Sequence, residues 1–274
     1  MTEPFESPRA PRLGPRRPLP SIVLHLSLVL VAIAAAAVRP ARADVAAEIA
    51  AGDVAYAQGQ LPRALAAFQA ALKEDPKHFS ALWRLSRAES EAGEDAKGEE
   101  RKQLIASAVE HARLATQVAP DSARGHLALA IALGRQALKE GPKTKLALAR
   151  EIKSEVDRAL QADASLGRAY HVRAMWNREV ASLNALERMA ANTVLGGVPK
   201  GASMDNAVND LERAVSLEPD YVNHRLELGR TYLMLKRRDD ARRELEKAVA
   251  LAPTSNPRDA HYQTEARELL KKLK

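Results

Sequence analysis

The chain has 274 residues, a formal net charge of +7, no cysteine and only 4% aromatic residues. The lack of cysteine excludes disulfides and thiolate chemistry. Alanine-rich segments with apolar residues at helical spacing predominate, and strand-like runs of valine, isoleucine and threonine are absent. The composition therefore predicts an all-α fold.

The first 43 residues have the pattern of an export signal. Arginines at positions 12, 16 and 17 precede an apolar run at 22–38, which is followed by Ala41-Arg42-Ala43. A basic start, a hydrophobic middle and an Ala-x-Ala close predict cleavage before Asp44.

Two locations follow from this leader. If it is cleaved, residues 44–274 form one exported domain, periplasmic or secreted. In the alternative, the leader stays attached and anchors the chain in the inner membrane through residues 21–38, a run near the lower length limit for crossing a bilayer. The membrane is then met only through this N-terminal segment.

The basic balance of the chain comes largely from the leader. Residues 1–43 hold six arginines against two glutamates, and their removal leaves 36 basic against 33 acidic residues. A net charge of +3, without a zinc finger or an arginine-rich tract, does not indicate a nucleic-acid partner.

A 34-residue pattern can be read twice without gaps in the remaining chain. Both copies have a glycine in a first helix, then Ala-x3-(Phe/Leu), Ala and Pro in and after a second helix. These residues are Gly52, Ala64, Phe68, Ala71 and Pro76 in the first copy, and Gly229, Ala241, Leu245, Ala248 and Pro253 in the last. The pattern resembles the tetratricopeptide repeat (TPR), a helix-turn-helix unit that stacks into an α-solenoid.

The same helix-closing position recurs three more times, at Pro120, Ala164 and Pro219. We therefore predict a TPR-type α-solenoid of about five helix-turn-helix units. Insertions are expected near 92–100, 136–145 and 180–202. The stretch from 257 to 274 is apolar on one face and charged off it, which predicts a C-terminal capping helix.

The third insertion is predicted to extend a helix of the fourth unit and then to form a loop. Its apolar residues recur at spacings of three and four, at Leu183, Leu186, Met189, Ala190 and Val194, before Gly196-Gly197. Two roles remain open for this stripe. It packs on the neighbouring unit, or it forms an exposed ledge for a partner or a membrane.

No motif for catalysis, for a cofactor or for a metal is present. The chain has neither a glycine-rich phosphate loop nor a nucleophile elbow. No two of its seven histidines are three or four residues apart, so no metal-binding helix face is expected. We therefore expect a protein that is not an enzyme and that needs no cofactor.

The TPR register also predicts a binding groove. Residues at fixed places of the first helix of each unit point to the concave face, and many of them are basic. The predicted groove residues are Arg87, Arg124, Arg135, Arg168, His171, Arg178, Asn223 and Arg230. Because arginine binds carboxylates in two-point contacts, the stripe favours an acidic peptide or a C-terminal carboxylate. In the alternative, these arginines pair with acidic residues of adjacent helices.

Residues 105–273 resemble the regulator of microtubule dynamics family and its bacterial relatives. The resemblance rests on the helix around Trp176, on the insertion before "DNAV" at 205–208 and on the ending "QTEA" at 263–266. It implies an all-helical solenoid without catalytic residues to carry over. The microtubule role is not expected here, because a chain with a bacterial-type leader would not meet tubulin.

Together these features predict a non-catalytic, exported TPR scaffold that binds a protein or peptide in its concave groove. The alternative is a membrane-anchored accessory factor of an envelope transport or secretion assembly.

Overall fold

A computed structural model describes residues 41–194, 197–252, 254 and 256–273, and this part of the chain holds twelve helices and no strand. Residues 41–274 form one unit. The predicted leader up to residue 40, the predicted helix end at Gly196 and the repeat proline Pro253 lie outside the described residues.

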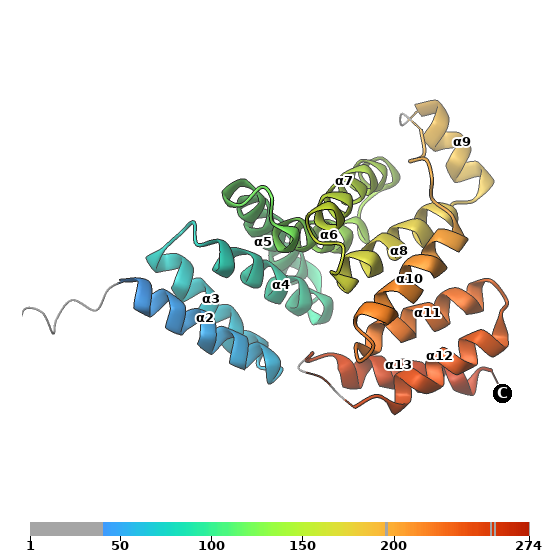
Figure 1. Cartoon of the computed structure of the whole chain (residues 1–274). Coiled ribbons are helices and arrows are strands. Elements are labelled where there is room, and N and C mark those ends of the chain that lie inside the picture. Colours follow the sequence, from blue (N-terminus) through green and yellow to red (C-terminus); the bar gives the residue numbers. More distant parts are fainter. Residues whose placement is uncertain (1–40, 195–196, 253, 255, 274) are drawn as a thin grey trace, which may run out of the picture. The chain divides into compact units, whose positions relative to one another are not determined.

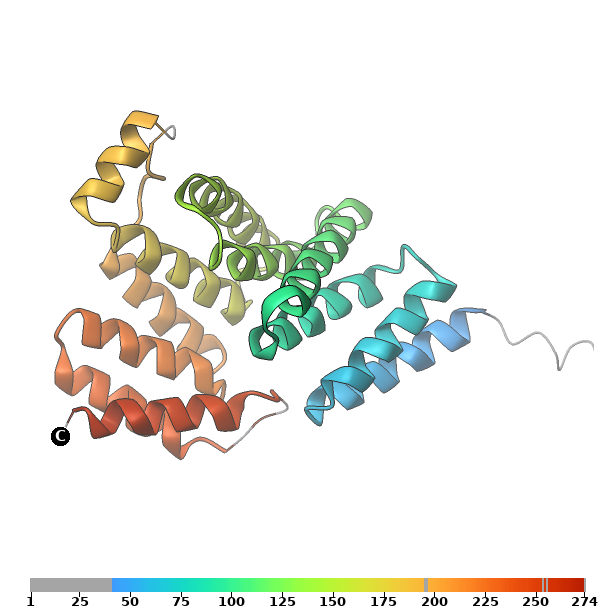
Figure 2. The ribbon, with the colours of Figure 1, turned by 180° about the vertical axis from the view of Figure 1, so that it is seen from behind.

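The helices form five antiparallel pairs and a cap, stacked side by side (Figures 1 and 2). The pairs are α2 (Ala41–Ala57) with α3 (Leu61–Glu74), α4 (Phe79–Asp95) with α5 (Gly98–Val118), α6 (Ala123–Ala137) with α7 (Pro142–Ala162), α8 (Gly167–Ala181) with α10 (Met204–Leu217), and α11 (Val222–Met234) with α12 (Arg238–Ala250). The cap is α13 (Asp259–Lys271). The predicted all-α TPR solenoid with five units and a capping helix is confirmed.

The register of the repeats follows from three buried positions in each second helix. These residues are Ala64, Phe68 and Ala71 in α3, Ala108, Ala112 and Ala115 in α5, Ile152, Val156 and Ala159 in α7, Ala207, Leu211 and Ala214 in α10, and Ala241, Leu245 and Ala248 in α12. All lie in the core, with small residues where two helices approach each other. The apolar core is consequently distributed along the array, in successive clusters, as expected of a repeat protein.

The insertions differ in their effect. The first two lengthen helices, since α5 and α7 each have 21 residues. The third was predicted to extend a helix, and this was wrong: α8 ends at Ala181 and a separate helix, α9 (Ala185–Val194), follows. Asn184 caps α9, because its side chain accepts a hydrogen bond from the Glu187 amide at 2.9 Å while Glu187 accepts one from the Asn184 amide at 2.8 Å.

The start of α9 also ends α8. The Arg188 guanidinium donates hydrogen bonds to the carbonyls of Val180 and Ala181, at 3.2 and 2.8 Å, which satisfies groups left unpaired at the end of α8. Two side chains therefore account for the break between α8 and α9: Asn184 caps the start of α9, and Arg188 binds the last carbonyls of α8.

Three residues of the predicted apolar stripe, Leu186, Met189 and Ala190, are exposed on α9. Leu186 is 69% and Met189 is 59% accessible to solvent. Replacing both by serine should therefore change the free energy of unfolding by less than about 0.5 kcal/mol. Urea melts of the double variant Leu186→Ser/Met189→Ser measure this. A loss of several kcal/mol would mean that the stripe is packed on a neighbouring unit.

Among the described residues, no helix is both long and apolar enough to cross a membrane.

Candidate binding site on the inner helices

The first helices of three units, together with two turns, line a cavity of about 210 Å³. Its lining residues are Asp53, Tyr56 and Ala57 from α2, Arg87 from α4, Arg168 from α8, and Tyr221 and Asn256 from the turns that precede α11 and α13. A second chamber of about 50 Å³ shares Arg87, Arg168 and Tyr221 with it. We call the surface around these two chambers the inner surface.

Arg87 enters the cavity from α4 with its hydrogen-bonding capacity unused. Its guanidinium carbon lies 3.8 Å from the ring centre of Tyr56, and its nearest carboxylate contact, with Asp53, is 3.9 Å long. The Nε atom is buried and has no hydrogen-bond partner among the described residues. Burial lowers the pKa of Arg87 below its usual 12.5, and the charge of Arg168 adds to this effect. The side chain nevertheless remains a cation at neutral pH.

Arg168 faces the same cavity from the start of α8. Its Nε lies 3.5 Å from Glu218, which is beyond good hydrogen-bond length, and its guanidinium lies 4.9 Å from the ring centre of Tyr221. Neither Arg87 nor Arg168 donates a side-chain hydrogen bond within the part of the chain that the structure describes. Both arginines are thus held in place by aromatic faces and loose charge pairs.

Two tyrosines supply further donors at the cavity. Burial raises the pKa of Tyr221 to about 12 and raises that of Tyr56 as well. Both hydroxyls therefore keep their protons at neutral pH. The Tyr56 hydroxyl donates a long hydrogen bond of 3.4 Å to Glu91.

Other predicted groove arginines are neutralised by carboxylates. Arg135 pairs with Glu94, which is the alternative that the sequence left open. Arg178 donates to Glu227 at 2.7 Å, and Arg230 contacts both Glu227 and, at 3.0 Å, Glu265. Acidic residues of adjacent helices therefore pair with these members of the predicted basic stripe.

The remaining predicted groove residues do not line the chambers. Arg124 is exposed, and its guanidinium lies 5.4 Å from the centre of the Trp83 ring. Asn223 is half-buried, and its Oδ1 is inaccessible and has no hydrogen-bond partner among the described residues. The cavity thus brings together only Arg87 and Arg168 of the eight predicted residues, with Arg135 at the smaller chamber.

His171 joins α8 to α11 through a second histidine. Its Nδ1 lies 2.9 Å from Nδ1 of His224, so one ring donates a proton and the other accepts it. Burial lowers the pKa of both rings; the charges of His224 and Arg178 lower that of His171 further, whereas Glu218 partly opposes the effect on His224. Both rings are therefore neutral at pH 7.

This pair should make the protein less stable in acid. Both folded-state pKa values lie below 6.5, so the unfolded chain binds protons that the folded chain excludes once the pH falls below 6.5. The stabilisation is full above pH 6.5 and is progressively lost on acidification toward pH 5. Denaturant melts between pH 7.5 and 5 measure it.

The double variant His171→Gln/His224→Gln isolates the effect of the pair. Its stability should fall less than that of the wild type over this range. The comparison is needed because His111 acts with the opposite sign: burial lowers its pKa, but the bond to Glu89 outweighs this and raises it. Parallel pH profiles for the two proteins would contradict the assignment.

No group of three histidines or acidic residues within the described ranges is arranged to hold a metal ion. Sequence reasoning missed the two cavity tyrosines and Asn256. Tyr56 lies on the first helix of the first unit, at a groove position that the register could have assigned, whereas Tyr221 and Asn256 lie in turns outside those positions.

Relatives of the chain are found among proteins named for microtubule dynamics. The model of the family "Regulator of microtubule dynamics protein 1-3" matches residues 49–274. Regulator of microtubule dynamics protein 1 of Caenorhabditis elegans is 30% identical over 191 residues, which cover 70% of this chain and 84% of that protein. The Bos taurus protein of the same name is 32% identical over 193 residues, which cover 69% of this chain and 60% of that protein. The chain therefore spans less than two thirds of the bovine relative.

Solved structures agree on the fold. A thermophilic TPR protein of Thermus thermophilus superposes with a TM-score of 0.63 at 21% identity, covering 83% of this chain and 99% of that chain. The pilF protein of Pseudomonas aeruginosa gives 0.52 at 15% identity, with 85% and 93% covered. At these identities the likeness concerns the helical architecture alone.

Proposed function

Because the chain belongs to the regulator of microtubule dynamics protein 1-3 family and has the TPR fold of a protein-interaction scaffold, we propose that its inner surface binds a protein or peptide. The partner would insert one anionic group, an acidic side chain or a C-terminal carboxylate, between Arg87 and Arg168. This proposal narrows the predicted groove to Arg87 and Arg168, the two predicted residues that line the larger cavity.

The unused donors carry the proposal. A buried donor without a partner costs about 1–3 kcal/mol, so folded proteins rarely retain one without a reason. The Nε of Arg87 is such a donor, and Arg168 lies across the same cavity. A carboxylate placed between two guanidinium groups accepts charge-assisted hydrogen bonds, which are stronger than neutral ones.

The size of the cavity limits what enters it. Its volume of about 210 Å³ lies below the roughly 300–1,000 Å³ typical of pockets for drug-sized ligands. One side chain or one terminal residue fits, whereas a longer segment of the partner must remain outside.

A peptide selection tests the proposal. The purified chain is panned against random octapeptides that carry free C-termini. We expect the wild type to enrich peptides with aspartate, glutamate or an essential terminal carboxylate, and the variant Arg87→Gln/Arg168→Gln to lose that enrichment. The matched control Arg63→Gln/Arg267→Gln removes the same charge from exposed outer positions and should select as the wild type does. The proposal is refuted if Arg87→Gln/Arg168→Gln enriches acidic peptides as strongly as the control variant does, or if the wild type shows no preference for acidic peptides.

The location of the protein is a second part of the proposal. The leader pattern supports export and a mature start at Asp44. Such a cleavage removes only the first three residues of α2 and leaves the buried Val45 and Ile49 in place. N-terminal sequencing of the protein from the envelope fraction should read Asp44 first. A product that retains residues 1–43 in the membrane fraction favours instead the anchored accessory factor of a transport or secretion assembly.

The names of the curated relatives refer to microtubule dynamics. Purified tubulin is therefore a defined protein to include in the binding measurements. An exported chain is expected not to bind it, and saturable binding lost in Arg87→Gln/Arg168→Gln would redirect the partner assignment while keeping the site.

A further inference from the structure

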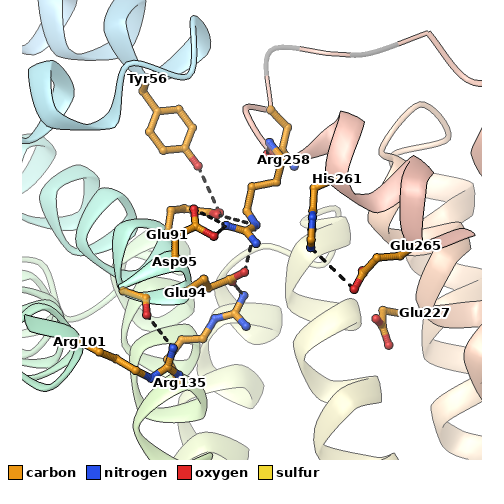
Figure 3. A network of polar contacts seen from close by, with 12 residues as sticks. Tyr56, Glu91, Glu94, Asp95, Arg101, Arg135, Glu227, Arg258, His261 and Glu265 are labelled. Atoms are coloured by element: carbon orange, nitrogen blue, oxygen red, sulfur yellow. Dashed lines mark hydrogen bonds and ion pairs between the residues drawn. The ribbon is translucent and has the colours of Figure 1, made fainter. Parts of the chain in front are cut away.

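Arg258 joins the turn before α13 to the second unit of the solenoid. Arg258 precedes α13, yet its guanidinium reaches three carboxylates of α4 (Figure 3). Its Nη1 donates to both oxygens of Asp95 at 3.0 Å, and its Nε lies 3.0 Å from Glu94 and 3.8 Å from Glu91. Arg258 and Asp95 are 163 positions apart in the sequence.

A compact turn holds this arginine in position. The Thr254 amide and hydroxyl donate to the Asp259 carboxylate at 2.6 and 2.7 Å, and the Asn256 amide donates to the Thr254 hydroxyl at 3.1 Å. The Arg258 amide then donates to the Asn256 side chain at 3.0 Å. These local bonds fix the backbone of the turn at Arg258, so less backbone freedom is lost when its side chain meets α4.

The same turn forms one wall of the cavity. Asn256 lines the cavity, and Pro257 lies next to the turn that follows α2, where a Cβ added to Gly59 would be 3.5 Å from the proline Cβ. Within the described residues, α13 packs on α11 and α12, whereas no extensive helix packing joins it to α2, α3 or α4. The closure therefore depends mainly on polar side-chain contacts, which one changed residue can weaken.

We propose that Arg258 is a reversible clasp: while it holds α4, the C-terminal turn closes the cavity to a peptide chain, and its release admits the partner. This inference rests on the function proposed above, since it concerns access to the same site. A small dicarboxylate should enter with the clasp closed, because the cavity accommodates it, whereas a peptide needs the wall to move aside.

An engineered disulfide tests the clasp. The chain has no cysteine, so Gly59→Cys/Pro257→Cys introduces one defined pair whose Cβ separation suits a disulfide. Gly59 has a φ of 71°, which strains a cysteine, so the single variant Gly59→Cys is the control for that strain. Two probes are titrated against the oxidised and reduced proteins: glutarate, and the acidic peptide recovered in the selection above.

We expect oxidation to weaken peptide binding at least about tenfold, with recovery on reduction, and to leave glutarate binding unchanged. In the protein without added cysteines, Arg258→Gln should raise peptide affinity about fivefold or more, because a larger fraction of the molecules has the C-terminal turn released from α4. Arg267→Gln, which alters an exposed arginine of the same helix, should not change it. Equal peptide affinity in the oxidised and reduced proteins overturns the clasp alone. Failure of both probes to bind any form removes the proposed function, and the clasp with it.

Discussion

Replacing Gly229 by leucine is expected to lower the free energy of unfolding by about 2–4 kcal/mol. Gly229 lies where α11 crosses α12, and a Cβ added to it would be 2.7 Å from Cγ of Leu245. Leu245 is fully buried and has no space to withdraw, so the two helices must separate. Urea melts followed by far-UV circular dichroism measure the loss.

Gly134 provides the matched comparison. It also lies inside a helix, α6, but a Cβ added to it meets no described atom within 4 Å. Alanine at Gly134 should stabilise the protein by about 0.5–1 kcal/mol, because it restricts the unfolded chain, whereas alanine at Gly229 should destabilise it. If the two alanine variants shift stability in the same direction, the helix contact assigned to Gly229 is wrong.

Replacing Trp176 by alanine is expected to cost about 3–5 kcal/mol. The indole is 5% exposed and packs in the cluster that joins α6, α7 and α8. Its Nε1 also donates a hydrogen bond of 2.7 Å to the carbonyl of Ala149 in α7. Loss of the ring leaves a cavity at the middle of the array and removes this hydrogen bond.

Phenylalanine at Trp176 separates the two contributions. It keeps much of the apolar volume and removes the hydrogen bond, so about 1–2 kcal/mol of the loss should remain. Unfolding is followed by circular dichroism, because the fluorescence of a Trp176 variant would come from Trp83 alone, the only other tryptophan. A loss below about 1 kcal/mol for Trp176→Ala would place this side chain outside the core.

The repeat register could be predicted because it depends on local spacing. Small residues are required wherever two helices of a unit touch, so Ala64 and Ala241 define it directly, and both are fully buried. The break between α8 and α9 was missed although a local signal exists. Asn184 and Glu187 have the spacing of a helix cap, but the apolar stripe from Leu183 onward suggested a continuous helix.

The inner surface was predictable only in part. The register placed Arg87 and Arg168 on first helices, and both line the cavity. It could not show that Arg135 and Arg178 have carboxylate partners, because those carboxylates lie on neighbouring helices at positions set by the stacking. The contact of Arg258 with α4 depends on the accumulated rotation from the second unit to the fifth, which no local pattern encodes.

We propose that one negative charge of the partner lies between Arg87 and Arg168. The dissociation constant is measured for the selected acidic peptide and for a neutral form of the same peptide. In the neutral form each aspartate or glutamate is replaced by its amide, and the C-terminus is amidated if binding requires the terminal carboxylate. Wild type and Arg87→Gln/Arg168→Gln are compared at fixed salt. The account predicts that neutralisation weakens binding to the wild type at least about tenfold and has little effect on the variant, a coupling of about 1.4 kcal/mol or more. Equal effects of neutralisation on both proteins would contradict it.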